Sequence, residues 1–347
     1  MSARVTILIA SYLEPEHVEK IGALDPRLQV LYEPDLLRKP RYAADHNGVD
    51  TARSAEGEAR WRRLLAQADI LFDFDYTNDR DLPELATRVK WIQATSAGIG
   101  QFVARRRYHE RMPHTIFTTA RGVHARPLSE FCALAMLAFS RGLFLMHDLQ
   151  SRKHWERFAA TDLLDRTVVI FGHGAIGREV GRLAHALGMK VVGVKRSVGI
   201  EDPRTHDVDE LHRASEFRAV LPRADFLVLT APHTVETEGI LGRAEIALLK
   251  KGAVLINIGR GALVDEPALI EALRTGHLSG AALDVFAVEP LPRESPLWSM
   301  PNVLVSPHSA STSDRENARL TELFCQNLRR FLEGAPLRNV LDVKRLY

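Results

Sequence analysis

The sequence contains little cysteine. Only Cys132 and Cys325 occur among 347 residues, far apart and in no metal-ligating or redox spacing. We therefore expect reduced thiols and no metal site. Net charge is also small, at +2, because 46 basic residues nearly balance 44 acidic ones. A chain this close to neutral has no overall electrostatic signature of a nucleic-acid or anionic-membrane partner. The composition predicts a cytoplasmic protein that binds neither.

Long hydrophobic runs are absent as well. The longest apolar-rich stretch, 131–144, is interrupted by Ser140, Arg141 and Gly142, and it is too short to cross a bilayer. The run 5–10 is too short for the apolar part of a secretory signal and has no cleavage pattern after it. We expect neither a secretion signal nor a membrane span.

Short apolar runs alternate with helix-like segments along most of the chain. Such runs are typical of strands buried on both faces, and their alternation with helices predicts parallel βαβ units. The length is that of about two domains. We therefore predict an α/β fold with two Rossmann-like, doubly wound parallel-sheet domains and a cleft between them. The expected strands are 5–10, 68–73, 90–94, 115–118, 167–171, 190–194, 225–230, 253–257, 281–285 and 302–305.

Helical periodicity and turn residues complete this outline. Helices are expected at 56–68, 129–139 and 313–333. Ser129 is a candidate N-cap, and Gly334 is placed to end the last helix. The turn-rich segment 121–127 is a candidate joint between domains. The polar segment 36–50 breaks the strand–helix alternation, so we interpret it as a long loop, either a lid over the site or a mobile surface insertion.

The sharpest local motif is G-x-G-x-x-G at Gly172, Gly174 and Gly177, directly after the expected strand 167–171. In a dinucleotide site the first glycine permits the tight turn and the second lets backbone N–H groups approach the pyrophosphate. The third allows close packing of helix on strand. The pyrophosphate would lie at the helix N-terminus, beside Ala175 and Ile176. The alternative is the glycine-rich loop of a methyltransferase that uses S-adenosylmethionine.

The end of the next strand distinguishes two cofactors. Enzymes that use NAD usually have an acidic residue there, which binds the ribose hydroxyls. This chain has Lys195, Arg196 and Ser197 instead. Arg196 with Ser197 is suited to a 2′-phosphate, so we predict NADP(H) in preference to NAD(H). The alternative is that both cations face solvent and either cofactor serves.

Three titratable residues follow the expected strands of the second half. Arg260, Glu289 and His308 come after the strands 253–257, 281–285 and 302–305 respectively. The carboxyl ends of parallel strands are where such sheets bind ligands. Together the three residues could support the reduction of a 2-oxo acid by a hydride from a bound cofactor: the arginine binds the carboxylate, the histidine donates a proton, and the glutamate holds and charges the histidine.

These motifs, in this order, resemble those of the D-isomer-specific 2-hydroxyacid dehydrogenase family, which includes glyoxylate/hydroxypyruvate reductases. The resemblance runs from about residue 90 to residue 310 and is weak over the first 85. It implies a discontinuous substrate domain, 1–121 plus 311–347, and a dinucleotide-binding domain, 122–310. It also implies hydride transfer between NAD(P)H and a 2-oxo acid or its D-2-hydroxy acid.

The resemblance further implies particular contacts. Backbone groups of Ala97, Gly98 and Ile99 would bind the substrate carboxylate. Further cofactor contacts would come from Ala231, Pro232, Ile258 and Asp284, the last beside the nicotinamide carboxamide. Segment 141–166, with Trp155, matches the region that forms a homodimer arm.

Two other functions remain open at this point. One is an NAD-dependent D-2-hydroxyacid dehydrogenase for a bulkier substrate. The other is a dinucleotide-sensing scaffold similar to transcriptional corepressors with this fold.

Overall fold

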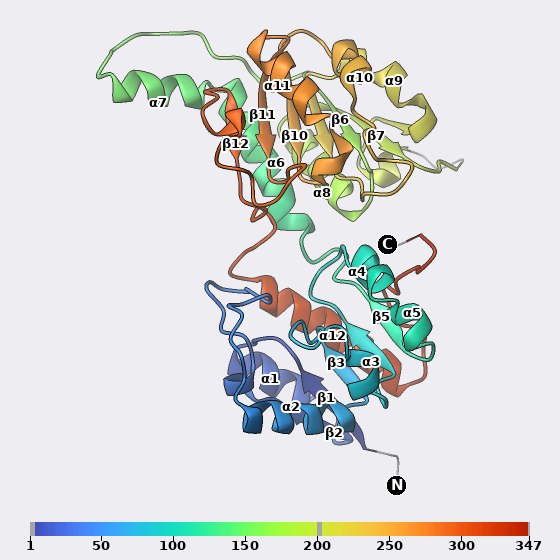
Figure 1. Ribbon diagram of the computed structural model, residues 1–347. Helices are drawn as coiled ribbons and strands as arrows, with labels where there is room; N and C mark the ends of the chain where they lie inside the picture. Colours follow the sequence, from blue (N-terminus) through green and yellow to red (C-terminus); the bar gives the residue numbers. More distant parts are fainter. Residues whose placement is uncertain (1–3, 200–202, 346–347) are drawn as a thin grey trace. The chain divides into compact units, whose positions relative to one another are not determined.

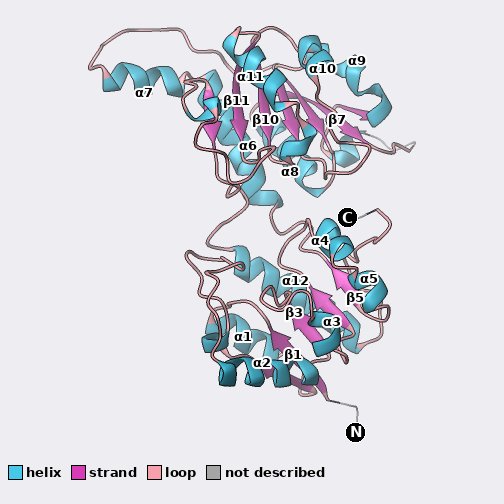
Figure 2. Cartoon of the chain, in the orientation of Figure 1, coloured by secondary structure: helices cyan, strands magenta, loops and turns pink. Residues whose placement is uncertain are grey.

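The computed structural model describes residues 4–199 and 203–345. The chain divides into two compact units: unit 1 is Met1–His124 with Thr312–Tyr347, and unit 2 is Ala125–Ser311. The sequence places these boundaries at 121/122 and 310/311. Each unit is built on one parallel sheet with helices packed against it (Figures 1 and 2).

Unit 1 has a five-stranded parallel sheet in the order β2-β1-β3-β4-β5. The strands are β1 (Val5–Ile9), β2 (Leu28–Leu31), β3 (Ile70–Phe72), β4 (Trp91–Gln93) and β5 (Ile116–Thr118). The helices are α1 (Pro15–Gly22), α2 (Ala55–Gln67), α3 (Leu82–Leu85), α4 (Gly100–Arg105), α5 (Tyr108–Arg111) and α12 (Glu316–Leu332), with a 3-10 turn, η1, at Pro34–Leu36. Each face of the sheet has its own core, one around Trp61 and Phe74, the other around Trp91 and Phe324.

Unit 2 has a seven-stranded parallel sheet in the order β12-β11-β10-β9-β6-β7-β8. The strands are β6 (Thr167–Phe171), β7 (Lys190–Lys195), β8 (Glu210–Arg213), β9 (Phe226–Leu229), β10 (Ala253–Asn257), β11 (Leu278–Leu283) and β12 (Val303–Val305). The helices are α6 (Ala125–Ser140), α7 (Leu143–Ser151), α8 (Ala175–Ala186), α9 (Phe217–Val220), α10 (Arg243–Leu248) and α11 (Glu266–Arg274). Short 3-10 turns are η2 (Pro203–His206), η3 (Ala214–Glu216), η4 (Leu221–Arg223), η5 (Gly261–Leu263) and η6 (Pro296–Trp298).

The predicted fold class, α/β with two parallel sheets of the Rossmann type, is confirmed. The central strands β9 and β10 are buried along their whole length, which is why they appear in the sequence as continuous apolar runs. The sequence prediction missed β2 and β8. Both are edge strands with side chains that are mainly half-buried, so neither carries such a run.

The N-cap predicted at Ser129 is wrong. Helix α6 begins at Ala125, and Ser129 lies buried within it, its hydroxyl donating to the carbonyl oxygen of Arg126 at 2.7 Å. Pro127 is tolerated in the first turn because an N–H there has no intrahelical partner. In the part of the chain that the structure describes, no single helix could span a bilayer, and only α6 and α7, bent by 61°, meet the length and composition test as a pair.

Candidate active site

The glycine-rich loop lies where the strand order of unit 2 reverses. The chain runs outward from β6 through β7 to β8, then returns to the other side of β6 with β9, and ligands bind at such reversal points. Gly172, with φ +103°, follows β6 and touches the loop after β9 so closely that a Cβ would lie 2.4 Å from the Ala231 nitrogen. The Thr230 hydroxyl donates to the Gly172 carbonyl at 2.6 Å. Only glycine fits at this contact.

The next glycines shape the start of α8. Gly174 is its N-cap, and a Cβ there would meet only the Gly172 carbonyl oxygen, at 3.8 Å, so the turn is open on that side. At Gly177 a Cβ would lie 3.1 Å from the same oxygen, so the helix packs tightly on the loop. Ala175 and Ile176 begin the helix, whose first N–H groups have no intrahelical acceptors. An open turn beside free N–H groups fits the pyrophosphate of a dinucleotide.

His173, within the glycine motif, supports the glycine-rich loop from inside the unit, a contact that the sequence prediction missed. It is 4% exposed, and its Nε2 lies 2.7 Å from the carbonyl oxygen of His206. Burial lowers the pKa of His173 to about 4, so the ring is neutral at pH 7 and donates from Nε2. Its ring also packs on β7, where a Cβ at Gly193 would lie 3.0 Å from its Cγ. Because a variable motif position carries no signal, only the fold reveals this role.

The residues predicted to bind the ribose phosphate lie on the neighbouring strand. Lys195 ends β7, and Arg196 and Ser197 follow it as exposed residues. Val194 is in register with Phe171, so this strand end lies next to the end of β6. Their role toward a 2′-phosphate stays a prediction.

His308 and Glu289 meet beyond the ends of β12 and β11. Nδ1 of His308 lies 2.7 Å from Glu289 Oε2, and the side chains are 47% and 36% exposed. The other carboxylate oxygen accepts from the Phe286 amide at 3.0 Å, which fixes the glutamate. The imidazole is thus oriented through Nδ1, while Nε2 remains the nitrogen available for a reactant.

Arg260 follows β10 on a turn built by Asn257. The Asn257 side chain accepts from the Gly259 amide and donates to the Arg260 carbonyl, both at 3.1 Å. The arginine is half-buried, so burial lowers its pKa, an effect that the negative charge of Glu289 opposes. A Cβ at Gly261 would lie 1.9 Å from the Phe286 carbonyl carbon, so the loops after β10 and β11 are in direct contact.

Asp284 has a structural role that the sequence interpretation did not include. It is 1% exposed, and its Oδ1 accepts from the Ser306 hydroxyl at 2.6 Å and from the Ser309 and Ala310 amides at 2.8 and 3.0 Å. Its carbonyl oxygen accepts from the His308 amide at 2.9 Å. Asp284 therefore holds the segment that carries His308, and a contact with the cofactor stays a prediction.

Three further residues predicted to contact the cofactor differ in their exposure to solvent. Ile258 is 5% exposed and packs in the core beneath the sheet, so its side chain is engaged away from a ligand. Ala231 is 4% exposed and contacts the glycine loop, whereas Pro232 beside it is exposed. Contacts of these residues with a cofactor stay predictions. The described residues contain no group of three or more His, Cys, Asp or Glu side chains placed to hold a metal ion.

The predicted carboxylate-binding residues Ala97, Gly98 and Ile99 lie in unit 1. Gly98 is exposed, and its amide donates to the Ser96 hydroxyl at 3.2 Å, while Ile99 is 3% exposed and packs in the core. Thr95, which precedes this loop, is bonded to Asp73.

Asp73 supports the loop of Ala97, Gly98 and Ile99 through a hydrogen bond with Thr95. It is fully buried, with φ +69°, and its Oδ2 accepts from the Thr95 hydroxyl at 2.9 Å. Burial raises the pKa of Asp73, opposed by nearby His46 and by the hydrogen bonds to its carboxylate. A strained backbone and a buried carboxyl at one residue are features that typically mark functional regions.

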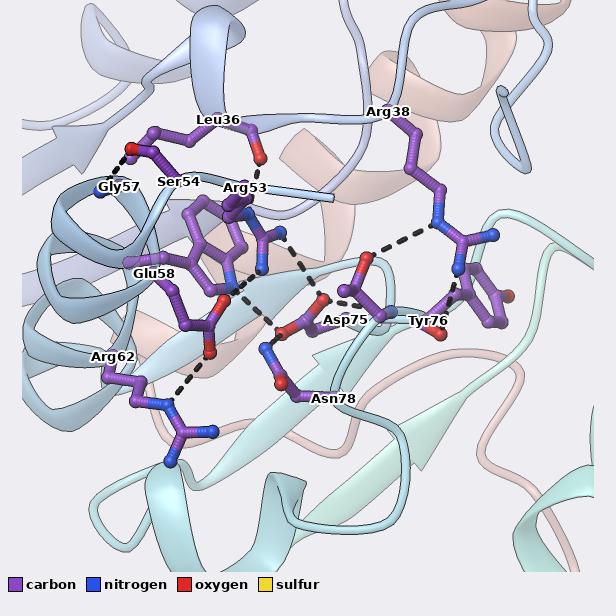
Figure 3. A network of polar contacts seen from close by, with 12 residues as sticks. Leu36, Arg38, Arg53, Ser54, Gly57, Glu58, Arg62, Asp75, Tyr76 and Asn78 are labelled. Carbon is purple, nitrogen blue, oxygen red and sulfur yellow. Dashed lines mark hydrogen bonds and ion pairs between the residues drawn. The ribbon is translucent and has the colours of Figure 1, made fainter. Parts of the chain in front are cut away.

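The loop that follows η1 is fastened to the same edge of the sheet (Figure 3). At one end Arg38 donates to the Thr77 hydroxyl at 3.3 Å. At the other, Arg53 donates to the Leu36 carbonyl at 2.6 Å and lies 3.5 Å from Asp75. Asp75 in turn accepts from Trp61 Nε1 at 2.8 Å. The loop is thus anchored at both ends, and its role, lid or surface insertion, stays a prediction.

Comparison with known proteins shows the family to which the chain is similar. Residues 133–310 match the family described as D-isomer specific 2-hydroxyacid dehydrogenase, NAD binding domain. A D-3-phosphoglycerate dehydrogenase of Methanocaldococcus jannaschii is 31% identical over 81% of this chain and 53% of its own length, so the chain spans about half of that relative. This family description confirms the predicted nicotinamide dinucleotide class of cofactor.

Two solved structures cover nearly the whole chain. A D-isomer specific 2-hydroxyacid dehydrogenase from Xanthobacter autotrophicus Py2, in complex with NADPH and MES, has a TM-score of 0.78 and 26% identity over 99% of this chain and 100% of that one. An NADPH-dependent glyoxylate/hydroxypyruvate reductase from Sinorhizobium meliloti, in complex with NADP and sulfate, has a TM-score of 0.77 and 27% identity over the same shares. The chain belongs to the D-isomer specific 2-hydroxyacid dehydrogenase family.

Proposed function

We propose that the protein reduces small 2-oxo acids to D-2-hydroxy acids with NADPH, as a glyoxylate/hydroxypyruvate-type reductase. The observation that carries the proposal is the 2.7 Å contact between His308 Nδ1 and Glu289, beside Arg260 at the ends of adjacent strands. This is the arrangement of an oriented proton donor next to a cation that binds carboxylates.

In this proposal each side chain has one task. A bound nicotinamide dinucleotide supplies the hydride. Arg260 binds the substrate carboxylate and attracts the negative charge that develops on the carbonyl oxygen. His308 donates the proton from Nε2 to that oxygen, and Glu289, bonded to Nδ1, orients the ring.

The substrate class is tested with a panel of glyoxylate, hydroxypyruvate, pyruvate and branched 2-oxo acids, each with NADPH and NADH. We expect the highest kcat/KM for glyoxylate or hydroxypyruvate with NADPH. A preference for branched acids with NADH would favour the alternative dehydrogenase. Binding of the dinucleotide without oxidation of it by any acid would favour the sensing scaffold.

The preference for NADPH is proposed to depend on Arg196 and Ser197. Support comes from their exposed position at the end of β7 and from the two structural relatives with NADPH or NADP. Arg196→Ala should lower the ratio of kcat/KM for NADPH to that for NADH by about tenfold, the value of one charged contact of about 1.4 kcal/mol. Arg274→Ala, at an exposed arginine elsewhere in unit 2, should leave the ratio unchanged. A parent enzyme that prefers NADH would refute the proposal.

We also propose a homodimer formed through the arm of residues 141–166. Within unit 2, α7 and the segment after it project from the sheet and its covering helices (Figure 1). This arm exposes large apolar side chains, with Trp155 at 95% and Leu164 at 68%. Trp155→Ser with Leu164→Ser should give monomers in light scattering, whereas Val235→Ser, also 95% exposed but outside the arm, should not.

A further inference from the structure

A cavity in unit 1 is lined by four arginines. It has a volume of about 600 Å³ and lies along α12, beside residues 121–123 and 338–339. Arg121, Arg315, Arg319 and Arg338 line it, together with one acidic residue, Glu322. We propose that this cavity binds a small anion with two or more negative charges, such as a phosphate ester or a polycarboxylate. The proposal does not depend on the function proposed above.

Among the described residues, none of these arginines has a carboxylate partner. Glu322, the acid in the lining, already pairs with Lys20 at 2.9 Å. Arg319 donates to the Ser313 hydroxyl at 3.0 Å and Arg338 to the Gln326 side chain, and both acceptors are neutral. Over residues 4–199 and 203–345, no carboxylate lies within 4.0 Å of any of the four guanidinium groups.

What distinguishes this surface is that four such arginines line one cavity. Many other arginines of unit 1 have an acidic neighbour, as Arg27 does with Asp25 at 2.8 Å and Arg60 with Glu33 at 2.6 Å. Like charges gathered without a counter-charge repel one another, and a bound anion would relieve that repulsion. Guanidinium groups also match the oxygens of phosphate and carboxylate geometrically.

The backbone of the cavity wall is fixed before any ligand arrives. Asn327 is fully buried, and its side chain accepts from the Arg338 amide at 2.7 Å and donates to the Arg338 carbonyl at 3.1 Å. Asn339, with φ +58°, donates from its side chain to the Arg121 carbonyl at 2.8 Å. Two of the four arginines thus extend from held positions, so binding has little backbone to order.

The cavity is separate from the predicted anion contacts of the active site. Arg196 and Arg260 belong to unit 2, whereas every residue that lines the cavity belongs to unit 1. It lies at the two segments through which the chain passes between the units. There His124 Nε2 lies 3.1 Å from Glu316 Oε1, so the outgoing and returning segments already touch. An anion held by Arg121 and Arg315 would be a second link between them.

The test is isothermal titration of the full-length protein with inorganic pyrophosphate and, separately, with citrate. Saturating NADPH and constant ionic strength exclude the cofactor site and general screening. We expect one site per chain for at least one probe, and the probe that binds identifies phosphate or carboxylate chemistry. Arg121→Ala with Arg338→Ala should weaken binding at least tenfold. The matched pair Arg243→Ala with Arg274→Ala, at exposed arginines of unit 2, should not.

Two outcomes would overturn the proposal. One is the absence of binding by both probes in the parent protein. The other is binding that survives the Arg121 and Arg338 substitutions or is lost in Arg196→Ala, since either would place the anion elsewhere. Unfolding is excluded as a cause by comparing the thermal transitions of the variants. Because both arginines are exposed, their truncation should leave those transitions unchanged.

Discussion

The carboxyl edges of the two sheets use polar residues in opposite ways. In unit 2, Glu289 and His308 are 36% and 47% exposed, so a reactant could reach them. In unit 1, the corresponding edge has Asp73 and Asp75, which are fully buried and 2% exposed. An exposed titratable pair can exchange protons with a ligand, whereas a buried carboxyl is stable only when its hydrogen bonds are satisfied within the protein. The exposed edge of unit 2 is therefore the one suited to proton transfer, whereas the buried carboxyls of unit 1 hold the loops of their own unit in place.

The largest effect should come from the exposed edge. His308→Ala removes the proposed proton donor, so kcat should fall by about 10³-fold, as expected for loss of general acid catalysis. The dissociation constant for NADPH and the melting temperature should not change, because the side chain is half-exposed. His114→Ala, at an exposed histidine of unit 1, is the matched control. Turnover close to that of the parent enzyme would contradict the assignment.

Substitutions at the buried edge of unit 1 should lower stability and leave activity largely unchanged. Asp75→Ala leaves the Trp61 N–H and the Asn78 amide without their acceptor, and removes a charge 3.5 Å from the buried Arg53. We expect a loss of about 3 kcal/mol in the free energy of unfolding. The kcat of the folded enzyme should be retained. Asp314→Ala, at an exposed aspartate of unit 1, should cost almost nothing in a denaturant titration. If Asp75→Ala were as stable as the parent, the network would not hold the loop.

Substitution of Arg260 tests whether this half-buried charge of unit 2 binds the substrate or only stabilises the fold. Arg260→Lys keeps the charge but loses the planar pair of donors, so kcat/KM for a 2-oxo acid should fall by about 100-fold, or roughly 2.7 kcal/mol. Arg274→Lys should be neutral. Aldehydes without a carboxylate should react poorly in the parent and lose little in the variant. Equal rates for aldehydes and 2-oxo acids would rule out the carboxylate contact.

The contrast between the edges also explains what the sequence could predict. Gly172, Arg260 and His308 belong to short motifs that directly follow a buried strand, so their shared location follows from the strand pattern. The parallel fold was predictable for the same reason, since central strands are continuous apolar runs. The edge strands β2 and β8 have no such run, and the sequence prediction omitted them.

Contacts between distant segments could not be predicted. Arg53 and Trp61 meet Asp75 across 22 and 14 positions, from a loop end and a helix that carry no motif. His173 looks like a variable position until the fold brings it under Gly193 and beside His206. In each case the partner is determined by tertiary packing, for which one sequence holds no local signal.

His173 is a buried group of unit 2, and like the buried carboxyls of unit 1 it should affect stability. Its pKa is lowered to about 4, below the unfolded value of 6.5, so the unfolded chain binds the extra proton first as the pH falls. The stability that this shift contributes above pH 6.5 is therefore lost as the pH falls from about 6.5 to 4. At pH 5 the loss is about 2 kcal/mol in the free energy of unfolding. Thermal unfolding of His173→Gln should lack this component, so the stability gap between parent and variant should narrow from pH 7.5 to pH 5. A gap independent of pH would mean that His173 is not buried neutral.

The smallest effect should come from one hydroxyl in unit 1. Thr95→Val keeps the shape of the side chain but removes the 2.9 Å hydrogen bond to Asp73. If the bond positions the predicted carboxylate loop, KM for the 2-oxo acid should rise about fivefold, the equivalent of about 1 kcal/mol. KM for NADPH and kcat should stay constant, because the reacting groups are in unit 2.

Thr95→Ser provides the control for that experiment, since it restores the hydroxyl without the methyl group. Recovery of KM in the serine variant would assign the effect to the hydrogen bond rather than to packing. A merely structural role would lower the melting temperature of Thr95→Val and leave all kinetic constants of the folded enzyme unchanged. A fall in kcat at constant KM would instead give Asp73 and Thr95 a part in the chemical step. The assignment of chemistry to the edge of unit 2 and of loop positioning to the edge of unit 1 would then be wrong.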